Sequence, residues 1–548
     1  MKHNGSLLED KIKIATKSIL HKIEKYQKID NSGDLKVEIE GVKNEYVSQQ
    51  IIINSKIDAK YDVKISTLKN GQSIISNKNI DIYSAYYNEI NISHNNYKKG
   101  FYPDILIPIK DRISYKDNIV RKNSNQAIYF VIHIPINCQK GIYTGLIKVF
   151  IDDEYISIPL TLKVHDFILP IETHNKSAFA IWGPTYKIED MLTNIYGSRA
   201  RKAEISYFKF LLDYRISPTC LPIKDLSSPA NIVNTMIKYA TNKRISSYII
   251  PLKKCKSERF DQWFDERLLR KTINLMIKKS TNELNLFKKA YIYDLVDEPD
   301  YTGQYDKAHL FLDTLKDIVD KTLNEENFAG KEEVKQSLKN LYSLITVGRW
   351  DKELDKLGNN VTGYCPKFSL FDNQNNINDF INLQKNNKHI WAYGCNFPGL
   401  PYPTYQIDAD PIYQRSIGIL MYRYNIEGNL FWCTNVSRIF DGNKYCNNFD
   451  PYSSFYAFSS WPGDGYLLVK AGKYNKNSIK PYPTLRLLLV REGQQDYESL
   501  YQLESKGIRK EEIENKIQNI FDGAKPINNV EAFLTFKKII LERMLDNL

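Results

Sequence analysis

Residues 290–299 read AYIYDLVDEP, an apolar run that ends in two acids and a proline. Seven similar runs occur along the chain, and amphipathic segments such as 203–214 (AEISYFKFLLDY) and 265–279 (DERLLRKTINLMIKK) separate most of them. Eight alternating β/α units predict a (β/α)8 barrel, or TIM barrel. The other runs are 177–183 (SAFAIWG), 215–221 (RISPTCL), 246–252 (SSYIIPL), 342–348 (YSLITVG), 361–366 (VTGYCP), 389–396 (HIWAYGCN) and 428–435 (GNLFWCTN).

A doubly wound open sheet is the alternative to a barrel, because apolar runs bounded by Gly, Pro and Asn suit any parallel sheet. We place this second domain at residues 173–548. It is longer than the roughly 250 residues typical of a TIM barrel, which leaves room for long βα-loops. A helical C-terminal tail is expected from about Glu492, where Arg491 and Asp496 are expected to form a structural pair.

Residues 1–172 have a different character and are predicted to form an N-terminal antiparallel β-sandwich. Short β-branched runs alternate there with clusters of Gly, Asn and Asp. A short helical lead-in is expected at residues 6–30, because that segment is charged throughout. The predicted strands include 35–45 (LKVEIEGVKNE), 48–56 (SQQIIINSK), 127–137 (AIYFVIHIPIN) and 155–167 (YISIPLTLKVHDF).

Composition excludes several classes of protein. The 548 residues carry a net charge of +12, but the basic residues are interspersed, so a nucleic-acid partner is not expected. No stretch reaches about 18 uninterrupted apolar residues, which argues against a membrane-spanning helix. The first residues do not resemble a signal peptide, so a cytoplasmic location is expected unless a leader was removed. Seven Cys without a CxxC pair, and eight His without HExxH spacing, predict neither a metal site nor a cofactor.

Asp297 and Glu298 differ from the seven other acidic clusters of the chain by their position. They follow an apolar run, and Pro299 prevents the run from continuing as a paired strand. The C-terminal ends of barrel strands carry active sites, so this pair is a candidate site. The alternative is that the segment DEPD is a turn that caps the next helix.

Adjacent carboxylates favour one kind of glycoside hydrolysis. When an enzyme supplies both nucleophile and acid, two carboxyl groups lie roughly 5–5.5 Å apart across the scissile bond, and neighbouring residues suit this poorly. They suit substrate assistance better, in which the 2-acetamido oxygen of the sugar is the nucleophile. We assign Asp297 as the residue that orients the acetamide and stabilises the oxazolinium charge. Glu298, which reaches further, is assigned as the general acid and base.

The chain resembles glycoside hydrolase family 123 over nearly its whole length. The resemblance implies a β-sandwich followed by a (β/α)8 barrel, and release of β-linked N-acetylgalactosamine with retention by the substrate-assisted route. It gives Asp297 and Glu298 the same roles as above. The family tends to show Tyr-Pro-Gly where this chain has Lys470-Ala471-Gly472. The segments that carry the resemblance include 42–45 (VKNE), 102–104 (YPD), 141–145 (GIYTG), 167–170 (FILP), 214–218 (YRISP), 297–299 (DEP), 428–432 (GNLFW) and 491–493 (REG).

Other strand-like runs supply candidates for a sugar pocket. An aromatic wall behind the acetamide methyl would press its oxygen toward the anomeric carbon, although each ring is as often part of a barrel core. The candidates are Trp182, Tyr364, Trp391, Tyr393, Trp432 and Asn435, of which Trp391 is the most core-like and Asn435 could bond a sugar hydroxyl. Two other functions stay open: a β-N-acetylglucosaminidase of the same mechanism, and a non-catalytic carbohydrate-binding protein.

Overall fold

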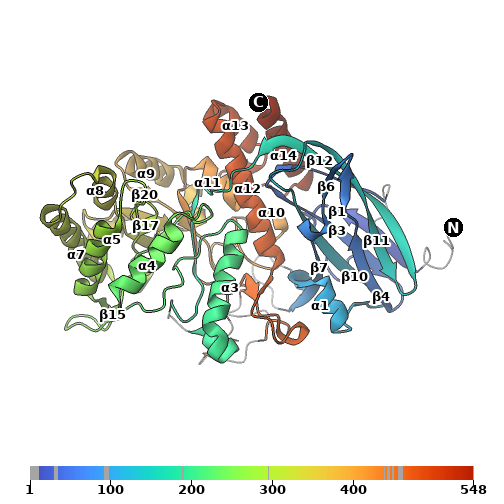
Figure 1. The fold of residues 1–548 in the computed structure, drawn as a ribbon, viewed down its shortest axis with the longest axis horizontal. Helices are drawn as coiled ribbons and strands as arrows, with labels where there is room; N and C mark the ends of the chain where they lie inside the picture. The colour runs from blue at the N-terminus through green and yellow to red at the C-terminus, as the bar shows by residue number, and fades with distance from the viewer. Residues whose placement is uncertain are drawn as a thin grey trace.

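The computed structural model describes residues 11–29, 35–91, 98–186, 190–293, 295–436, 439–440, 445–446, 450–453 and 461–546. Strands of the N-terminal third gather at one side of the molecule, and the helices of the remainder lie at the other side and in the centre (Figure 1). The chain is therefore a multi-domain mixed α/β protein with a β-rich N-terminal region. Among the described residues, no helix is long and apolar enough to cross a membrane.

The N-terminal region contains two sheets that share one apolar core. Side chains such as Ile51 and Phe130 from the first sheet pack against Ile147 and Leu162 from the second. The first sheet has the order β1 (Ile12–Lys17), β3 (Tyr46–Ser55), β10 (Ser124–His133), β7 (Ile80–Ile90) and β8 (Gly100–Pro108). The second has the order β2 (Val37–Lys43), β12 (Glu154–Ile168), β11 (Gly141–Ile151), β4 (Ala59–Ile65) and β9 (Ile119–Val120); β5 (Leu68–Asn70) also pairs with β11, and β6 (Ser73–Ile75) pairs with β5.

Two details differ from the sequence prediction. Residues 12–17 form strand β1, which pairs antiparallel with β3, so the predicted helical lead-in is wrong there. The segment KIKIAT alternates with a period of two, and Ile12 and Ile14 pack on the sandwich core. The sandwich is also not wholly antiparallel, because β2 pairs with β12 in parallel.

The eight runs predicted as barrel strands all pair in parallel with neighbours. Three ladders form: β13 with β22 and β21, β14 with β17, and β18 with β19 and β20. Isolated parallel bridges join Phe179 to Pro218 and Ile292 to Ser343, and the Ile249 N–H donates to Thr219 O at 3.0 Å. The strands are β13 (Lys176–Phe179), β14 (Tyr248–Ile249), β17 (Ala290–Tyr291), β18 (Leu344–Val347), β19 (Gly363–Pro366), β20 (His389–Ile390), β21 (Ala392–Tyr393) and β22 (Gly428–Phe431).

Helices stand between most of these strands and bury amphipathic faces. In α5, for example, Leu269, Ile273 and Met276 are buried at helical spacing. The connection from β18 to β19 is an exception, because it holds the short 3-10 helix η3 (Lys352–Leu357). The main helices are α2 (Met191–Tyr196), α3 (Ala200–Asp213), α4 (Pro229–Ala240), α5 (Glu266–Lys279), α7 (Tyr305–Glu325), α8 (Glu332–Lys339), α9 (Gln374–Lys385), α10 (Pro411–Arg415) and α11 (Ile417–Arg423).

The C-terminal helices join the two regions. They are α12 (Leu485–Ser505), α13 (Lys510–Ile517) and α14 (Val530–Asp546), so the tail begins a few residues before the predicted Glu492. α12 lies between the sandwich and the other helices (Figure 1). Near its start, the Arg486 guanidinium binds both carboxylate oxygens of Asp104, from β8, at 2.8 Å, and both side chains are fully buried.

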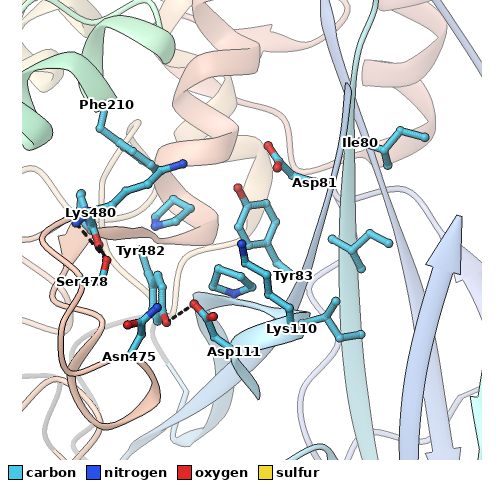
Figure 2. Close-up of a pocket in the computed structure, with 15 residues that line it drawn as sticks. Ile80, Asp81, Tyr83, Lys110, Asp111, Phe210, Asn475, Ser478, Lys480 and Tyr482 are labelled. Atoms are coloured by element: carbon cyan, nitrogen blue, oxygen red, sulfur yellow. Dashed lines mark hydrogen bonds between the residues drawn. The ribbon is translucent and has the colours of Figure 1, made fainter. Parts of the chain in front are cut away.

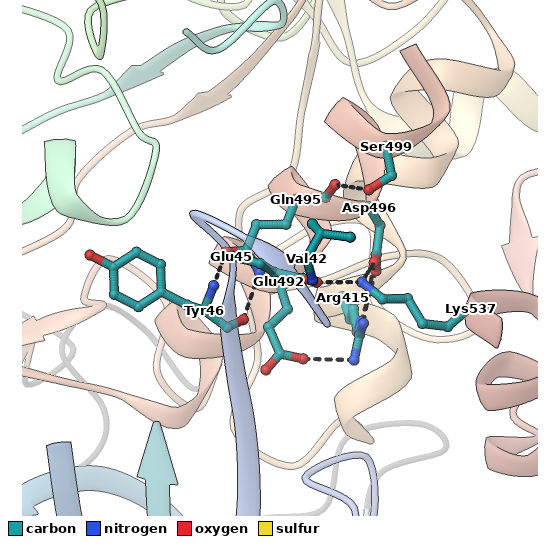
Figure 3. Close-up of polar contacts among 9 residues, drawn as sticks. All are labelled: Val42, Glu45, Tyr46, Arg415, Glu492, Gln495, Asp496, Ser499 and Lys537. Carbon is teal, nitrogen blue, oxygen red and sulfur yellow. Dashed lines mark hydrogen bonds and ion pairs between the residues drawn. The ribbon is translucent and has the colours of Figure 1, made fainter. Parts of the chain in front are cut away.

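A buried cluster of charges follows along α12 (Figure 3). Asp496 accepts from Arg415 at 2.8 Å and from Lys537, on α14, at 2.9 Å, and Lys537 also reaches Glu45 of the sandwich. Arg491 does not pair with Asp496 as predicted. Its guanidinium instead lies 4.1 Å from the centre of the Tyr46 ring.

Candidate active site

The acidic pair lies in the connection between β17, which ends at Tyr291, and the next helix, so the strand is shorter than the predicted run. Pro299 begins α6 (Pro299–Thr302) directly after Glu298. Glu298 has φ 40° and ψ 63°, in the left-handed region that residues other than glycine rarely occupy. Such backbone strain concentrates at functional sites. Asp297 and Glu298 lie outside any paired strand, so the alternation that sends neighbouring strand side chains to opposite faces does not apply to them.

Thr346, in β18, connects the two acids. Its hydroxyl accepts a hydrogen bond from the Glu298 N–H at 3.0 Å and donates one to Oδ1 of Asp297 at 2.7 Å. The hydroxyl of Thr302 donates to the backbone carbonyls of both acids, at 3.2 and 3.0 Å. Thr346 and Thr302 therefore both hold the backbone of the pair, and Thr346 also holds Oδ1 of Asp297.

Glu298 meets two donors from later strands. The Tyr393 hydroxyl donates a hydrogen bond to its Oε1, and Nζ of Lys367 lies 3.4 Å from the same oxygen. Burial lowers the pKa of Lys367, but Glu298, Cys395 and Tyr301 together outweigh that effect, so the pKa is raised overall. Within the described part of the chain, Oε2 of Glu298 has no hydrogen-bond partner.

Asp297 lines a cleft of about 430 Å³ together with Trp182 and Trp432. The two indole rings meet edge to face, with centroids 5.3 Å apart. The Asp297 carboxyl is open to the water of the cleft, yet surrounding protein atoms raise its pKa. The hydrogen bond from Thr346 opposes this rise, and the nearby charge of Glu298 adds to it. Other lining residues are Tyr186, Lys254, Gln262, Tyr293, Gln304 and Lys307.

Buried polar groups hold both tryptophans. Nε1 of Trp432 donates to Oδ1 of Asp464 at 3.0 Å, and burial raises the pKa of Asp464 to about 7. The amide of Asn435 is engaged with the Trp182 peptide: its Oδ1 accepts from the N–H at 2.9 Å and its Nδ2 donates to the carbonyl at 3.1 Å. Asn435 therefore positions Trp182.

The structure does not bring Tyr364 and Trp391 into this cleft. Trp391 is completely buried and packs on the Tyr291 ring, with centroids 5.0 Å apart. Tyr364 lines a different groove, beside α9. Both residues lie in the predicted strands, but neither lines the Asp297 cleft.

A second cavity, of about 400 Å³, lies between β7, α1 (Ile109–Ser114) and residues 475–483 (Figure 2). The Tyr482 hydroxyl donates to Asp111 there at 2.7 Å, and the Lys480 ammonium lies 5.5 Å from the centre of the Phe210 ring. This cavity shares no lining residue with the Asp297 cleft. None of the predicted site residues lines it.

Family models match both regions of the chain. A model of the glycoside hydrolase 123 N-terminal domain matches residues 14–151, and a model of the glycoside hydrolase 123 catalytic domain matches residues 231–503. The chain belongs to glycoside hydrolase family 123. It is a glycoside hydrolase, and Asp297 and Glu298 lie within the matched catalytic domain.

One solved structure shares the fold over nearly the whole chain. A family 123 glycoside hydrolase from Clostridium perfringens, which hydrolyses glycolipid glycans, is 16% identical and has a TM-score of 0.65. The match covers 98% of this chain and 97% of the other, so the fold is shared. A glucosidase from Croceicoccus marinus is 11% identical over 57% of this chain and 69% of its own, with a TM-score of 0.26. A comparison with curated proteins finds no match.

Three residues of this family 123 site were not predicted from the sequence: Thr346, Lys367 and Asp464. The first two had a usable signal, because they lie within or directly after predicted barrel strands, close to the C-terminal ends. Asp464 lies outside every predicted barrel strand. Only the order of the strands in space brings Lys367 beside Glu298.

Proposed function

We propose that this family 123 enzyme is a retaining exo-glycosidase that releases terminal β-linked N-acetylgalactosamine by substrate-assisted catalysis. The observation that carries the proposal is the adjacency of Asp297 and Glu298 directly before α6, with Asp297 anchored by Thr346 in a cleft that two tryptophans line. The Clostridium perfringens enzyme hydrolyses glycolipid glycans. Glycolipid glycans are therefore the first natural substrates to test.

The proposed catalytic domain is a (β/α)8 barrel. In its support, each of the eight runs pairs in parallel with a neighbour. β13 contacts both the run at 215–221, through the bridge from Phe179 to Pro218, and β22. A first strand paired with both the second and the last is what closure requires. The acidic pair would then lie at the C-terminal end of the fourth strand.

Asp297 would act on the acetamide of the sugar. Its carboxylate accepts the acetamide N–H while the acetamide oxygen attacks the anomeric carbon, and it then stabilises the positive charge of the oxazolinium. For this role Asp297 must be ionised, although the surrounding protein atoms raise its pKa. Hydrogen bonds donated by Thr346 and by the acetamide both favour the ionised form. The Trp182 and Trp432 rings provide an apolar wall for the acetamide methyl.

Glu298 would move the protons. Tyr393 and Lys367 engage Oε1, which leaves Oε2 available to the leaving group. In the first step, protonated Glu298 gives its proton to the glycosidic oxygen as the bond to the anomeric carbon breaks. In the second, the Glu298 carboxylate removes a proton from water, the water oxygen bonds to the anomeric carbon, and the oxazolinium ring opens. Two displacements at one carbon give net retention.

A screen of nitrophenyl N-acetylhexosaminides tests the proposal. Turnover of the β-N-acetylgalactosaminide in preference to the β-N-acetylglucosaminide is expected, and the reverse preference would assign the gluco sugar. Glu298→Gln should keep much activity on this good leaving group but lose it on glycans, whereas Asp297→Asn should damage both. A thiazoline analogue of the oxazoline should inhibit. An unchanged rate for Asp297→Asn would show that the assignment is wrong.

A further inference from the structure

A groove of about 860 Å³ lies between η3 and α9, beside β19. It exists because the connection from β18 to β19 holds only η3, whereas α7 and α8 precede it and α9 follows. η3 lies against α7, where Nδ1 of His309 is 3.2 Å from the backbone carbonyl oxygen of Lys356. The side of β19 next to α9 is therefore left open, and Tyr364 lines the groove there.

Two half-buried aromatic rings form the apolar part of the groove. The rings of Trp350 and Tyr364 meet edge to face, with centroids 5.1 Å apart. Nε1 of Trp350 donates to Asp379, on α9, at 3.0 Å, which fixes the indole. Burial and the charge of Asp355 raise the pKa of Tyr364 to about 12, so its hydroxyl stays protonated. Rigid rings with a polar edge suit a ligand that is apolar on one face and polar at its rim.

Amide side chains form much of the polar part of the groove. Asn359, Asn375 and Asn382 are exposed in the groove, and their side chains form no hydrogen bond with any described residue. An amide offers a donor and an acceptor together, as a sugar hydroxyl requires of its partner. The groove also holds three carboxylates and two lysines, so an acidic ligand is disfavoured.

We infer that this groove is a non-catalytic binding site for a neutral oligosaccharide. The apolar face of a pyranose would pack against Trp350 and Tyr364, and its hydroxyls would bond to the free amides. The groove shares no lining residue with the Asp297 cleft.

The groove begins near the catalytic end of the strands. The N–H groups of Gly348 and Arg349, just before Trp350, donate to Asp300 at 3.0 and 2.8 Å, and Asp300 follows the acidic pair. A glycan chain held in the groove would keep its neighbours close to the cleft and raise their effective concentration.

Titration with defined oligosaccharides tests this site. The probes are globotriose, cellotetraose and maltotetraose, which lack the terminal N-acetylhexosamine that the proposed exo-acting cleft requires, and 3′-sialyllactose as an acidic comparison. Binding to the full chain is measured by calorimetry and by saturation-transfer NMR. At least one neutral probe should bind, with a Kd below about 10 mM, and more tightly than 3′-sialyllactose.

Variants locate the binding. Asn375→Ala with Asn382→Ala removes two amides from exposed positions of α9, where alanine favours the helix, and should weaken binding by about tenfold. Tyr364→Ala should weaken it as well. Asn378→Ala, an exposed asparagine of the same helix that does not line the groove, is the matched control and should bind like wild type.

Three results would overturn the inference: no neutral probe binds up to about 10 mM, the double variant binds as tightly as wild type, or 3′-sialyllactose binds more tightly than every neutral probe. Hydrolysis of the nitrophenyl β-N-acetylgalactosaminide should be the same in the asparagine variants and wild type. Failure of that hydrolysis in wild type would contradict the proposed catalytic function and leave the binding result standing.

Discussion

Thr346 donates a hydrogen bond of 2.7 Å to Oδ1 of Asp297, and the same hydroxyl oxygen accepts the N–H of Glu298. One side chain therefore sets the orientation of the proposed stabiliser and the backbone of the proposed acid. It lies in β18, the strand that follows the acidic pair in the chain, and is almost completely buried. A buried hydroxyl with both bonds made restricts the rotamer of Asp297.

Thr346→Val should lower kcat by up to about 100-fold, because a small misplacement of a catalytic group is costly. The hydrogen bond from Thr346 lowers the pKa of Asp297, so its loss should also move the acid limb of the pH profile to higher pH. Thr346→Ser keeps the hydroxyl and should resemble wild type. The check is a pH–rate profile on the nitrophenyl substrate. A Val variant with an unchanged profile would show that Thr346 has no positioning role.

The contact between Trp432 and Asp464 should make KM and tryptophan fluorescence depend on pH. The pKa of Asp464 is raised to about 7, so its carboxylate forms as pH rises through 7 and then accepts a charge-assisted bond from the Trp432 indole. Above that pH the indole should be held more firmly, and KM should be lower. Tryptophan fluorescence should titrate with a midpoint near 7.

Two variants isolate this contact. Asp464→Asn keeps a hydrogen-bond acceptor but cannot ionise, so both the fluorescence transition and the pH dependence of KM should disappear. Trp432→Phe should remove the fluorescence transition and leave other tryptophan emission. A transition near pH 7 that persists in both variants would assign it to another group.

His133 should make stability fall in mild acid. Burial, followed by the charges of Arg244 and Arg491, lowers its pKa to about 4 from a usual value of 6.5. Between those values the unfolded chain binds a proton that the folded chain does not, so the free energy of unfolding falls as pH drops from 6.5 toward 4. His133→Phe can keep the stacking on Tyr46, whose ring centroid lies 4.4 Å away, and should flatten the fall.

His174 should change the pH dependence of the free energy of unfolding in the direction opposite to His133. The hydrogen bond to Glu498 raises its pKa, so its contribution to stability is present below 6.5 and is lost as pH rises through the folded pKa. His174→Phe should therefore steepen the fall in acid. Urea unfolding at pH 7.5 and pH 5 measures both effects. A His133→Phe protein with the wild-type difference between the two pH values would contradict the assignment.

The sequence pattern predicted features that depend on burial alone. Alternating and continuous apolar runs predicted most strands of the sandwich and all eight parallel-paired runs, because these patterns indicate which faces of a strand are buried. Residues 12–17 were predicted as helical because the segment around them is charged, but their lysines alternate with apolar residues as in a strand. The pattern did not show that Tyr364 and Trp391 lie outside the Asp297 cleft, because the face that a strand residue occupies depends on register. The contacts of Glu298 with Lys367 and Tyr393 depend on strand order, which no local pattern contains.

The charge cluster around Asp496 predicts a large loss of stability for one substitution and almost none for its neighbour (Figure 3). Lys537 binds Glu45 and Asp496, both of which are almost fully buried, at 2.8 and 2.9 Å. Lys537→Met leaves two buried carboxylates with one cation fewer, which should cost about 3–5 kcal/mol of the free energy of unfolding. Lys538→Met is the matched control, because its exposed pair with Glu542 at 4.0 Å is worth at most about 1 kcal/mol.

Since Glu45 belongs to the sandwich and Asp496 to α12, the Lys537 variant should also weaken the contact between the two regions. Limited proteolysis between residues 151 and 231 would detect this as faster cleavage than in the Lys538 variant. Equal urea midpoints for the two variants would mean that solvent already screens the cluster.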